Sequence, residues 1–362
     1  SYGTMTITNS EIENNGDEGI YLRDVGIDIE NNLISNNGEW GIHLYYNTLS
    51  SIPLTMITNN EIIDNGDAAI KIVTYEILGG VQLPFAGIHS NTVTGNYRDA
   101  IELAGSLSDG SVIGPDPELD YVVTRLNISE DAHVQIDPGT VIKLNYYHST
   151  FSPVPNIRID GDLDVLGTDI DPIYFTSALD DSVGGDIDGG ATTPSPGNWD
   201  GIGVSVGGTL TMDHGVVRYG GGDGYGNNLR VEGEATITNS TISHALRDGV
   251  SGYLDSTTTI SGSRIADNRE SGISSYGTMT ITNSEIENNG DEGIYGKNCG
   301  SLNIIGNLIL SNDYGISLYC TEQPIIISNN IENNASYGLA SSSSGIKVNA
   351  PNNFWGSSSG PD

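Results

Sequence analysis

The chain has 362 residues, with 13 Lys and Arg against 47 Asp and Glu, which gives a formal net charge of −34. This charge disfavours binding to nucleic acid and to anionic membrane surfaces, and no apolar run is long enough to span a bilayer. The 48 glycines follow no collagen period, and 18 tyrosines with abundant Ile provide too much apolar surface for a disordered chain. We therefore expect a folded acidic protein that suits cations, above all Ca²⁺.

A short motif, I-x-x-[NS]-x-[IV]-x-x-N, recurs through residues 1–101, with copies that begin at Ile7, Ile29, Ile57 and Ile88. Apolar letters alternate over three to five residues around each copy, which is typical of short strands and not of helices. The first two copies are 22 residues apart, so we predict solenoid coils of about 22 residues with three short strands each. The repeated Asn should form a ladder, because Asn tolerates left-handed turns and its amide can bond backbone groups of neighbouring coils.

The segments that connect these copies become longer along the chain. From the closing aliphatic residue to the next opening Ile, the distance is 15 residues at Ile42–Ile57 and 18 at Ile70–Ile88, and a further long segment follows Ile101. Equal register would place these loops on one edge of the solenoid, where loops commonly bind ligands; the alternative is tolerated surface insertion. The candidate groove residues are Tyr45, Tyr46, Tyr75, Glu76, Phe85, Asp116 and Glu118.

Residues 102–230 lack the Asn motif but keep strand signals, so we expect variant coils of the same solenoid. This region also contains the densest group of carboxylates, within the sequence DDSVGGDIDGG that begins at Asp180. Closely spaced Asp with Gly that permits tight turns is typical of a Ca²⁺ loop, and the alternative is a solvated acidic loop. The predicted metal ligands are Asp180, Asp181, Asp186 and Asp188.

The Asn motif resumes in residues 231–362, which end with the sequence NNFWG at 352–356. Residues 275–295 repeat residues 1–21 letter for letter, which indicates a recent duplication. Cys299 and Cys320 are 21 residues apart, which is about one coil. We therefore expect them to stack on adjacent coils and to form a disulfide bond, with stacked free thiols as the alternative.

These repeats resemble the right-handed parallel β-helix repeat proteins, a group that includes polysaccharide lyases, glycosidases, phage tailspikes and surface adhesins. The resemblance covers most of the chain, and the N-x-W-G ending is similar to the closing element of such repeats. The strings DPGTVIKL at 137–144 and GNWDGI at 197–202 also resemble coils of extracellular surface β-helix proteins. The resemblance implies an all-β, right-handed parallel β-helix, one continuous solenoid over residues 1–362, and an extracellular or cell-surface location.

Two kinds of function are compatible with this fold. We favour a non-enzymatic structural or adhesive module of a surface or fibre protein, which contacts polysaccharide, cell-surface glycans or further copies of itself. The long identical copy supports this reading, and no catalytic residues can be assigned from the motifs present. The alternative is a polysaccharide lyase or glycoside hydrolase, or a carbohydrate-binding module without catalysis, whose site lies in the groove of the long loops.

Overall fold

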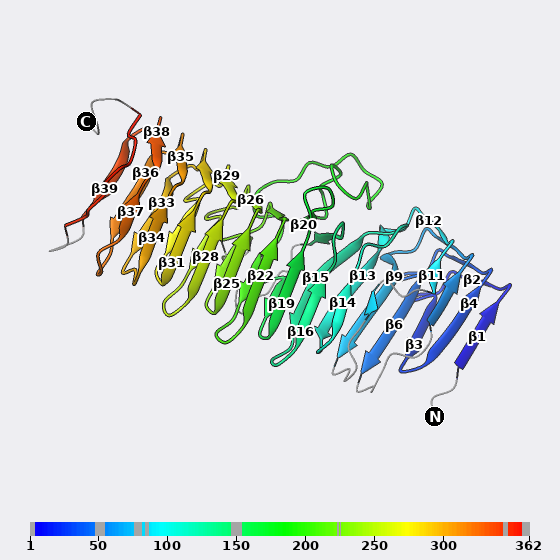
Figure 1. Cartoon of the computed structure of the whole chain (residues 1–362). Coiled ribbons are helices and arrows are strands. Elements are labelled where there is room, and N and C mark those ends of the chain that lie inside the picture. The colour runs from blue at the N-terminus through cyan, green and yellow to red at the C-terminus, as the bar shows by residue number, and fades with distance from the viewer. Residues whose placement is uncertain are drawn as a thin grey trace.

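The computed structural model describes residues 4–47, 55–75, 82–83, 87–145, 154–222, 224, 226–342 and 347–356. Within these ranges the chain forms 39 β-strands and no helix, so the described residues include no helix that could cross a membrane. The strands pair in parallel with their equivalents in neighbouring coils, as at β1–β4 and β28–β31. Figure 1 shows the coils side by side along the length of the molecule. The predicted all-β parallel β-helix is confirmed.

The first four coils form the N-terminal stack, which has three parallel sheets. The first sheet contains β1 (Thr4–Thr8), β4 (Gly26–Glu30), β7 (Thr55–Thr58) and β11 (Ile88–His89). The second contains β2 (Glu11–Glu13), β5 (Leu33–Ser35), β8 (Glu61–Ile63) and β12 (Thr92–Thr94). The third contains β3 (Ile20–Arg23), β6 (Ile42–Asn47), β9 (Ala68–Tyr75) and β13 (Arg98–Leu107).

The remaining coils form the longer C-terminal stack, again with three parallel sheets. The first sheet contains β10 (Gln82–Leu83), β14 (Ser111–Ile113), β16 (His133–Ile136), β19 (Asp162–Leu166), β22 (Thr209–Asp213), β25 (Glu234–Thr238), β28 (Thr257–Ser261), β31 (Thr278–Thr282), β34 (Leu302–Ile305) and β37 (Ile325–Ile327). The second contains β17 (Val141–Leu144), β20 (Ile173–Ser177), β23 (Gly215–Arg218), β26 (Thr241–Ser243), β29 (Arg264–Ala266), β32 (Glu285–Glu287), β35 (Leu308–Leu310) and β38 (Asn330–Glu332). The third contains β18 (Ile157–Ile159), β21 (Ile202–Val204), β24 (Leu229–Val231), β27 (Val250–Gly252), β30 (Ile273–Ser275), β33 (Glu292–Lys297), β36 (Tyr314–Tyr319) and β39 (Tyr337–Ser341).

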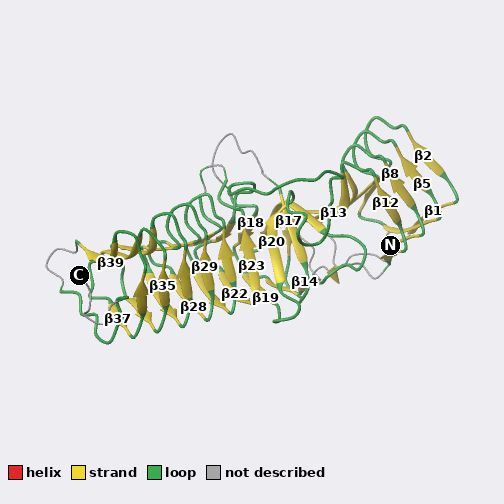
Figure 2. Ribbon diagram, turned by 90° about the horizontal axis from the view of Figure 1, so that it is seen from above, coloured by secondary structure: helices red, strands yellow, loops and turns green. Residues whose placement is uncertain are grey.

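The two stacks are joined by strands β13 and β15 (Tyr121–Ile128). The first half of β13 pairs with Tyr121–Val123, which in turn pairs with β17, so the third sheet of the N-terminal stack continues into the second sheet of the C-terminal stack. The second half pairs with Leu126–Ile128, which leads into β18 and starts a new third sheet. The other two N-terminal sheets end at β11 and β12. Figure 2 shows the N-terminal coils as a block set beside the longer stack.

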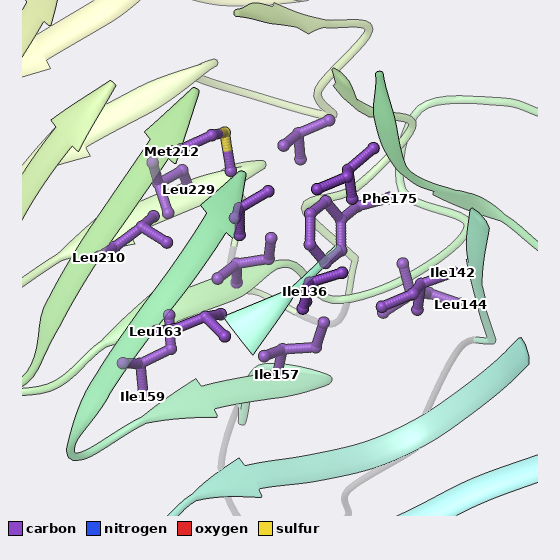
Figure 3. Packing of buried hydrophobic residues seen from close by; sticks show 14 of the residues in the cluster. Ile136, Ile142, Leu144, Ile157, Ile159, Leu163, Phe175, Leu210, Met212 and Leu229 are labelled. Atoms are coloured by element: carbon purple, nitrogen blue, oxygen red, sulfur yellow. The ribbon is translucent and has the colours of Figure 1, made fainter. Parts of the chain in front are cut away.

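The core consists of aliphatic side chains that stack in columns from coil to coil. In the C-terminal stack, for example, Ile237, Ile260 and Ile281 occupy one register position, and all three are fully buried. Figure 3 shows the same kind of packing in the middle of the chain, around Phe175 and Met212. Burial of these columns is the main driving force of the fold, because an isolated coil cannot cover its own apolar face.

The motif Asn residues form the predicted buried ladder, and a second ladder runs through Asn residues of the Ser/Asn column, such as Asn32 and Asn60. Asn65 is typical: its Nδ2 donates to Asn96 Oδ1 at 2.8 Å and to the Ile34 carbonyl at 3.1 Å. Its Oδ1 accepts from both the Nδ2 and the backbone N–H of Asn37, at 2.9 and 3.2 Å. Every polar atom of the amide is therefore satisfied inside the solenoid, where an unsatisfied group would be destabilising.

The left-handed turns lie one residue earlier than we expected. Positive φ values occur at Asn36 (53°), Asp64 (55°) and Asn288 (54°), each of which precedes a ladder Asn. The preceding residue thus adopts the left-handed conformation of the turn, and the ladder residue makes the hydrogen bonds inside it. This division explains the frequent Asn-Asn pairs in the sequence. Ala245, the exception in the column, is compensated by Asn228, whose Oδ1 accepts from the Gly220 N–H at 2.7 Å and whose Nδ2 donates to the Ser243 carbonyl at 2.6 Å.

Candidate functional site

One column of side chains on the outer surface of the N-terminal stack stands out from the rest. It occupies the position directly after each closing aliphatic residue, where the side chain points away from the core because neighbouring residues of a strand alternate. Tyr21 pairs in register with His43, His43 with Lys71, and Lys71 with Glu102. Alignment of the repeats would have revealed this column, since the position is variable while its neighbours are not.

Aromatic rings gather around this column and form a continuous row, which we call the outer aromatic face (Tyr21, Trp40, His43, Tyr45 and Tyr75). The ring centroids of Tyr21 and of Trp40 both lie 5.0 Å from that of His43. Tyr45 follows at 6.4 Å from His43, and Tyr75 lies 5.8 Å from Tyr45. The exposed rings of Tyr21 and Tyr75 lie at the two ends of the row.

Ion pairs and hydrogen bonds hold these rings in place. His43 Nδ1 lies 2.8 Å from Glu18 Oε1, whereas its buried Nε2 has no hydrogen-bond partner among the described residues. Lys71 Nζ lies 3.6 Å from the ring centroid of Trp40 and 3.3 Å from Glu102 Oε1. The Trp40 indole N–H donates to Glu102 Oε2 at 2.7 Å. The surface therefore combines flat apolar rings with fixed charges of both signs.

The structure brings only part of the predicted groove to this face. Tyr45 and Tyr75 belong to it, but Tyr46 points into the core, is 1% exposed, and has its hydroxyl 2.9 Å from Thr55 Oγ1. Tyr46 was wrongly assigned, because adjacent residues of one strand cannot both face outward. Glu76 and Phe85 lie outside the described residues.

Asp116 and Glu118 do not line the outer aromatic face either. Asp116 Oδ1 accepts from the backbone N–H groups of Glu118 and Leu119, both at 2.9 Å, and so closes its own turn. Glu118 accepts from the N–H groups of Ser90 and Asn91 at 2.7 and 3.3 Å, where the next ladder residue would otherwise stand. Both carboxylates thus satisfy backbone donors where the N-terminal stack ends, which the loop sequence alone does not indicate.

The acidic loop lies across the outside of the junction between the stacks, and we call residues 178–200 the clasp loop; it stands out in green near β20 in Figure 1. Ile187 packs against Ala100 and Val122, the outward residues of β13 and β15, and its carbonyl accepts from the Asp99 N–H at 2.7 Å. The fully buried Lys143 holds the loop from below, since its Nζ donates to the carbonyls of Asp180 (3.1 Å) and Gly185. The clasp loop therefore contacts strands of both stacks.

Asp180 faces away from the other acidic residues of the loop. It is buried, and its Oδ2 lies 2.6 Å from Arg218 Nη2 while its Oδ1 accepts from Ser182 Oγ at 2.7 Å. This arrangement makes Asp180 unsuitable as a metal ligand, because its oxygens already have a cation and hydroxyl partners. Arg218 and Lys143 had no assignable role in the sequence, since both contacts join residues far apart in the chain.

The other three predicted ligands do lie together. Carboxylate oxygens of Asp181, Asp186 and Asp188 are all within 4.8 Å of one another. Burial, together with the nearby charges of Asp186 and Asp181, raises the pKa of Asp188. A divalent cation would relieve this repulsion, since hard cations prefer oxygen ligands. The arrangement therefore fits Ca²⁺ with three carboxylates and not four.

Cys299 and Cys320 form a disulfide bond in the C-terminal stack, where Cys299 follows β33 and Cys320 follows β36. Their Cα atoms are 4.9 Å apart, which is the spacing of adjacent coils. Both residues are buried beside the core of the C-terminal stack. The bond therefore ties two successive coils together and takes no part in the outer aromatic face.

Comparison with known proteins gives a family. A solved structure, the A-module of the Azotobacter vinelandii mannuronan C-5 epimerase AlgE6, aligns over 94% of this chain and 91% of that chain, with 12% sequence identity and a TM-score of 0.29. That TM-score is too low to support an argument about either shape or function. No curated protein matches the chain. The family described as "Right handed beta helix region" matches residues 1–78 and 225–360, which is more than half of the sequence. The chain therefore belongs to the right-handed β-helix family.

Proposed function

We propose that this protein is an extracellular, non-catalytic β-helix module that binds polysaccharide on its outer aromatic face, as part of a surface or fibre protein. The row of rings from Tyr21 through His43 and Tyr45 to Tyr75 is the observation that carries the proposal. Aromatic faces stack on the apolar faces of sugar rings, and nearby fixed charges can orient the hydroxyl or carboxylate groups of a sugar. A rigid solenoid holds such a face in position before the ligand arrives, which lowers the entropic cost of binding.

The proposal is tested by binding to a panel of acidic and neutral polysaccharides, with and without Ca²⁺. We expect at least one polysaccharide to bind without turnover, and the double variant Tyr45→Ala/Tyr75→Ala to weaken that binding about tenfold or more. Tyr97→Ala is the matched control, because Tyr97 is an exposed tyrosine of the same stack whose ring contacts Arg98 instead of the row. Equal loss in both variants, or no binding at all, would contradict the proposal.

A second candidate function is polysaccharide cleavage, which the Glu18–His43 pair favours. Glu18 orients the imidazole through Nδ1, and such a carboxylate–histidine pair can act as a general base at the other nitrogen. That nitrogen, Nε2, is buried in this structure, so catalysis requires the neighbouring side chains to move and expose it to the substrate. Lys71 lies in the next register position, but its ammonium is already paired with the buried Glu102 at 3.3 Å. Release of reducing ends or unsaturated products from any polysaccharide of the panel, abolished in His43→Ala, would select this function over binding alone.

We also propose that the clasp loop binds Ca²⁺ through Asp181, Asp186 and Asp188. Calorimetry should detect one Ca²⁺ site that disappears in Asp186→Ala/Asp188→Ala and persists in Asp160→Ala/Asp162→Ala, a control pair from another acidic stretch. Unchanged binding in the first variant would place the ion elsewhere. A cation site and a disulfide bond both suit the oxidising, calcium-rich extracellular environment that this proposal requires.

A further inference from the structure

The third sheet of the C-terminal stack carries an unusual concentration of tyrosine on its outer surface. Six of the 18 tyrosines of the chain lie there within five coils, four of them in one line of ring contacts and two in a separate stacked pair. These six, which we call the tyrosine platform, are Tyr253, Tyr276, Tyr295, Tyr314, Tyr319 and Tyr337. Their strands, β27 to β39, are at the C-terminal end of the row in Figure 1. The core does not require them, since Ile, Leu and Val fill the interior of these coils.

The rings follow one another along the solenoid axis. Tyr253 and Tyr276 have centroids 5.8 Å apart, and Tyr295 lies 6.2 Å from Tyr276. Tyr319 continues the line at 5.9 Å from Tyr295. A separate pair lies at the other end of β36, where Tyr314 and Tyr337 are stacked at 5.9 Å. The platform thus offers a new ring at nearly every coil, and Tyr337 is 60% exposed.

The residues between and beside the rings are polar, and several have short side chains. Ser251 and Ser274 are in register with Tyr295, but both are buried, and Ser251 Oγ donates to Asp248 Oδ2 at 3.0 Å. Glu292 lies at the start of the same strand and accepts from Ser271 Oγ at 3.0 Å. Such a surface resembles the lining of a carbohydrate site, in which flat apolar rings are combined with a few hydrogen-bonding groups.

The charge of the surroundings restricts the ligand. Asp248, Asp291 and Glu292 border the platform where the chain turns into these strands, and burial together with nearby carboxylates raises the pKa of all three, whereas Glu270 is paired with Arg247 at 3.0 Å. Arg230, whose guanidinium lies 4.0 Å from the ring centroid of Tyr253, is at the opposite end of the ring row from Tyr319. An acidic polysaccharide would be repelled along this border, whereas an uncharged one would not.

We infer that the tyrosine platform is a second binding site, separate from the outer aromatic face, for an uncharged polysaccharide chain that lies along the solenoid axis. Successive sugar rings would stack on successive tyrosines, and carboxylates beside the rings, such as that of Glu292, would accept hydrogen bonds from sugar hydroxyls. A chain that contacts several coils at once gains affinity with each added sugar, because the rings that it meets are already fixed in position.

The inference is tested by calorimetry of the full chain with three uncharged hexasaccharides, cellohexaose, mannohexaose and chitohexaose, and with the corresponding trisaccharides. We expect at least one hexasaccharide to bind about tenfold more tightly than its trisaccharide, with an affinity that salt does not change. The double variant Tyr276→Ala/Tyr319→Ala should lose this binding by about tenfold or more, while Tyr276→Phe/Tyr319→Phe, which keeps both rings, should retain it. Thermal melting of each variant separates lost binding from lost folding.

Two further outcomes separate this site from the one proposed above. Tyr45→Ala/Tyr75→Ala should leave hexasaccharide binding unchanged, because these residues lie on the N-terminal stack. If this variant loses the binding and the platform variant keeps it, the ligand is on the outer aromatic face and the inference is wrong. The inference is likewise overturned if none of the three hexasaccharides binds, or if the well-folded platform variant binds as the unchanged protein does; the tyrosines then act only in coil stacking.

Discussion

Residues 1–21 and 275–295 have the same sequence but different surroundings, and the comparison separates what the repeat determines from what its neighbours determine. Met279 of the second copy is fully buried between coils, whereas its equivalent Met5 is 46% exposed in the first coil. Tyr295 lies between Tyr276 and Tyr319, whereas its equivalent Tyr21 lies beside His43. The repeat therefore sets the strand positions, and the adjacent coils set both the burial and the chemistry of each surface.

The same comparison holds for an ionisable group. Burial acts to raise the pKa of Glu18, but hydrogen bonds with His43 and with the backbone, together with the charges of His43 and Lys71, outweigh it, so the pKa of Glu18 lies below its usual value. Burial raises the pKa of the equivalent Glu292, and the charges of Asp291 and Asp248 add to that effect. Identical residues thus have pKa shifts of opposite sign, because the residue one coil further on is His43 in one case and the uncharged Ser317 at the equivalent position in the other.

The largest difference in stability loss between equivalent substitutions of the two copies should appear in the core. Ile286→Ala removes a fully buried side chain between two coils and should lower the free energy of unfolding by about 2–5 kcal/mol. Ile12→Ala removes the equivalent but only partly buried side chain and should have a clearly smaller effect. Urea unfolding of the two variants measures the difference, and equal losses would mean that the first coil is as tightly packed as the inner one.

The disulfide bond has no counterpart in the first copy, where Val25 and Tyr46 stand at the positions that correspond to Cys299 and Cys320. Cys299→Ser/Cys320→Ser should lower stability by about 2–3 kcal/mol, since the bond closes a short loop in the unfolded chain. Tyr46→Phe removes only the hydroxyl contact with Thr55 and should cost about 1 kcal/mol. Thiol titration of the denatured, unreduced protein should find no reactive thiol; two reactive thiols would refute the bond in solution.

The ladder provides a matched pair of polar substitutions. Asn289 has four side-chain hydrogen bonds, with Asn268, Asn312 and the Ile265 carbonyl, so Asn289→Ala should cost about 1–3 kcal/mol. The equivalent Asn15 is exposed, and its Nδ2 donates to Asn37 at 2.8 Å. We expect Asn15→Ala to cost less than about 1 kcal/mol by the same unfolding measurement. A melting temperature unchanged in Asn289→Ala would show that the ladder contributes little to stability.

The smallest changes in stability are expected from Glu18→Gln and Glu292→Gln, and these two changes should have opposite signs. Because the pKa of Glu18 is lowered on folding, its stabilising contribution is present above its usual value of 4.5 and is lost as the pH falls through the folded pKa. Glu18→Gln should therefore destabilise the protein at neutral pH and have little effect in acid. The raised pKa of Glu292 makes its ionisation unfavourable, so Glu292→Gln should stabilise the protein at neutral pH, with no gain below pH 4.5. Shifts of the same sign would contradict the comparison.

The sequence was sufficient to predict features that recur in every coil. The Ile columns, the predicted Asn ladder and the stacking of Cys299 on Cys320 follow from a period near 22 and the alternation of strand residues, because neighbouring coils repeat the same local chemistry. The outward column of Tyr21, His43 and Lys71 could also have been read from aligned repeats. Such features depend only on which residues stand one coil apart.

The remaining features depend on contacts between segments that no repeat relates. Asp180 and Asp181 are neighbours in the chain, yet Arg218, 38 residues away, draws Asp180 out of the acidic cluster. Glu118 satisfies backbone groups of an earlier coil, a role that its place in a long loop does not indicate. The contact between Lys143 and the clasp loop could be predicted only if the position of the junction were known, and the sequence pattern alone does not define that position.

The junction itself has a mechanical consequence. The bending stiffness of a rod rises steeply with the thickness of its cross-section, and between the two stacks the cross-section falls from three sheets to the one that runs through β9, β13 and β15. Deformation would concentrate at this neck, with one sheet acting as a leaf spring. The clasp loop connects the two stacks on the outer side of this neck, through its contacts with Lys143 and Asp99. It therefore reinforces the molecule where the cross-section is thinnest. A tether under tension would yield there first, and a cation that stiffens the clasp loop would raise the force it withstands.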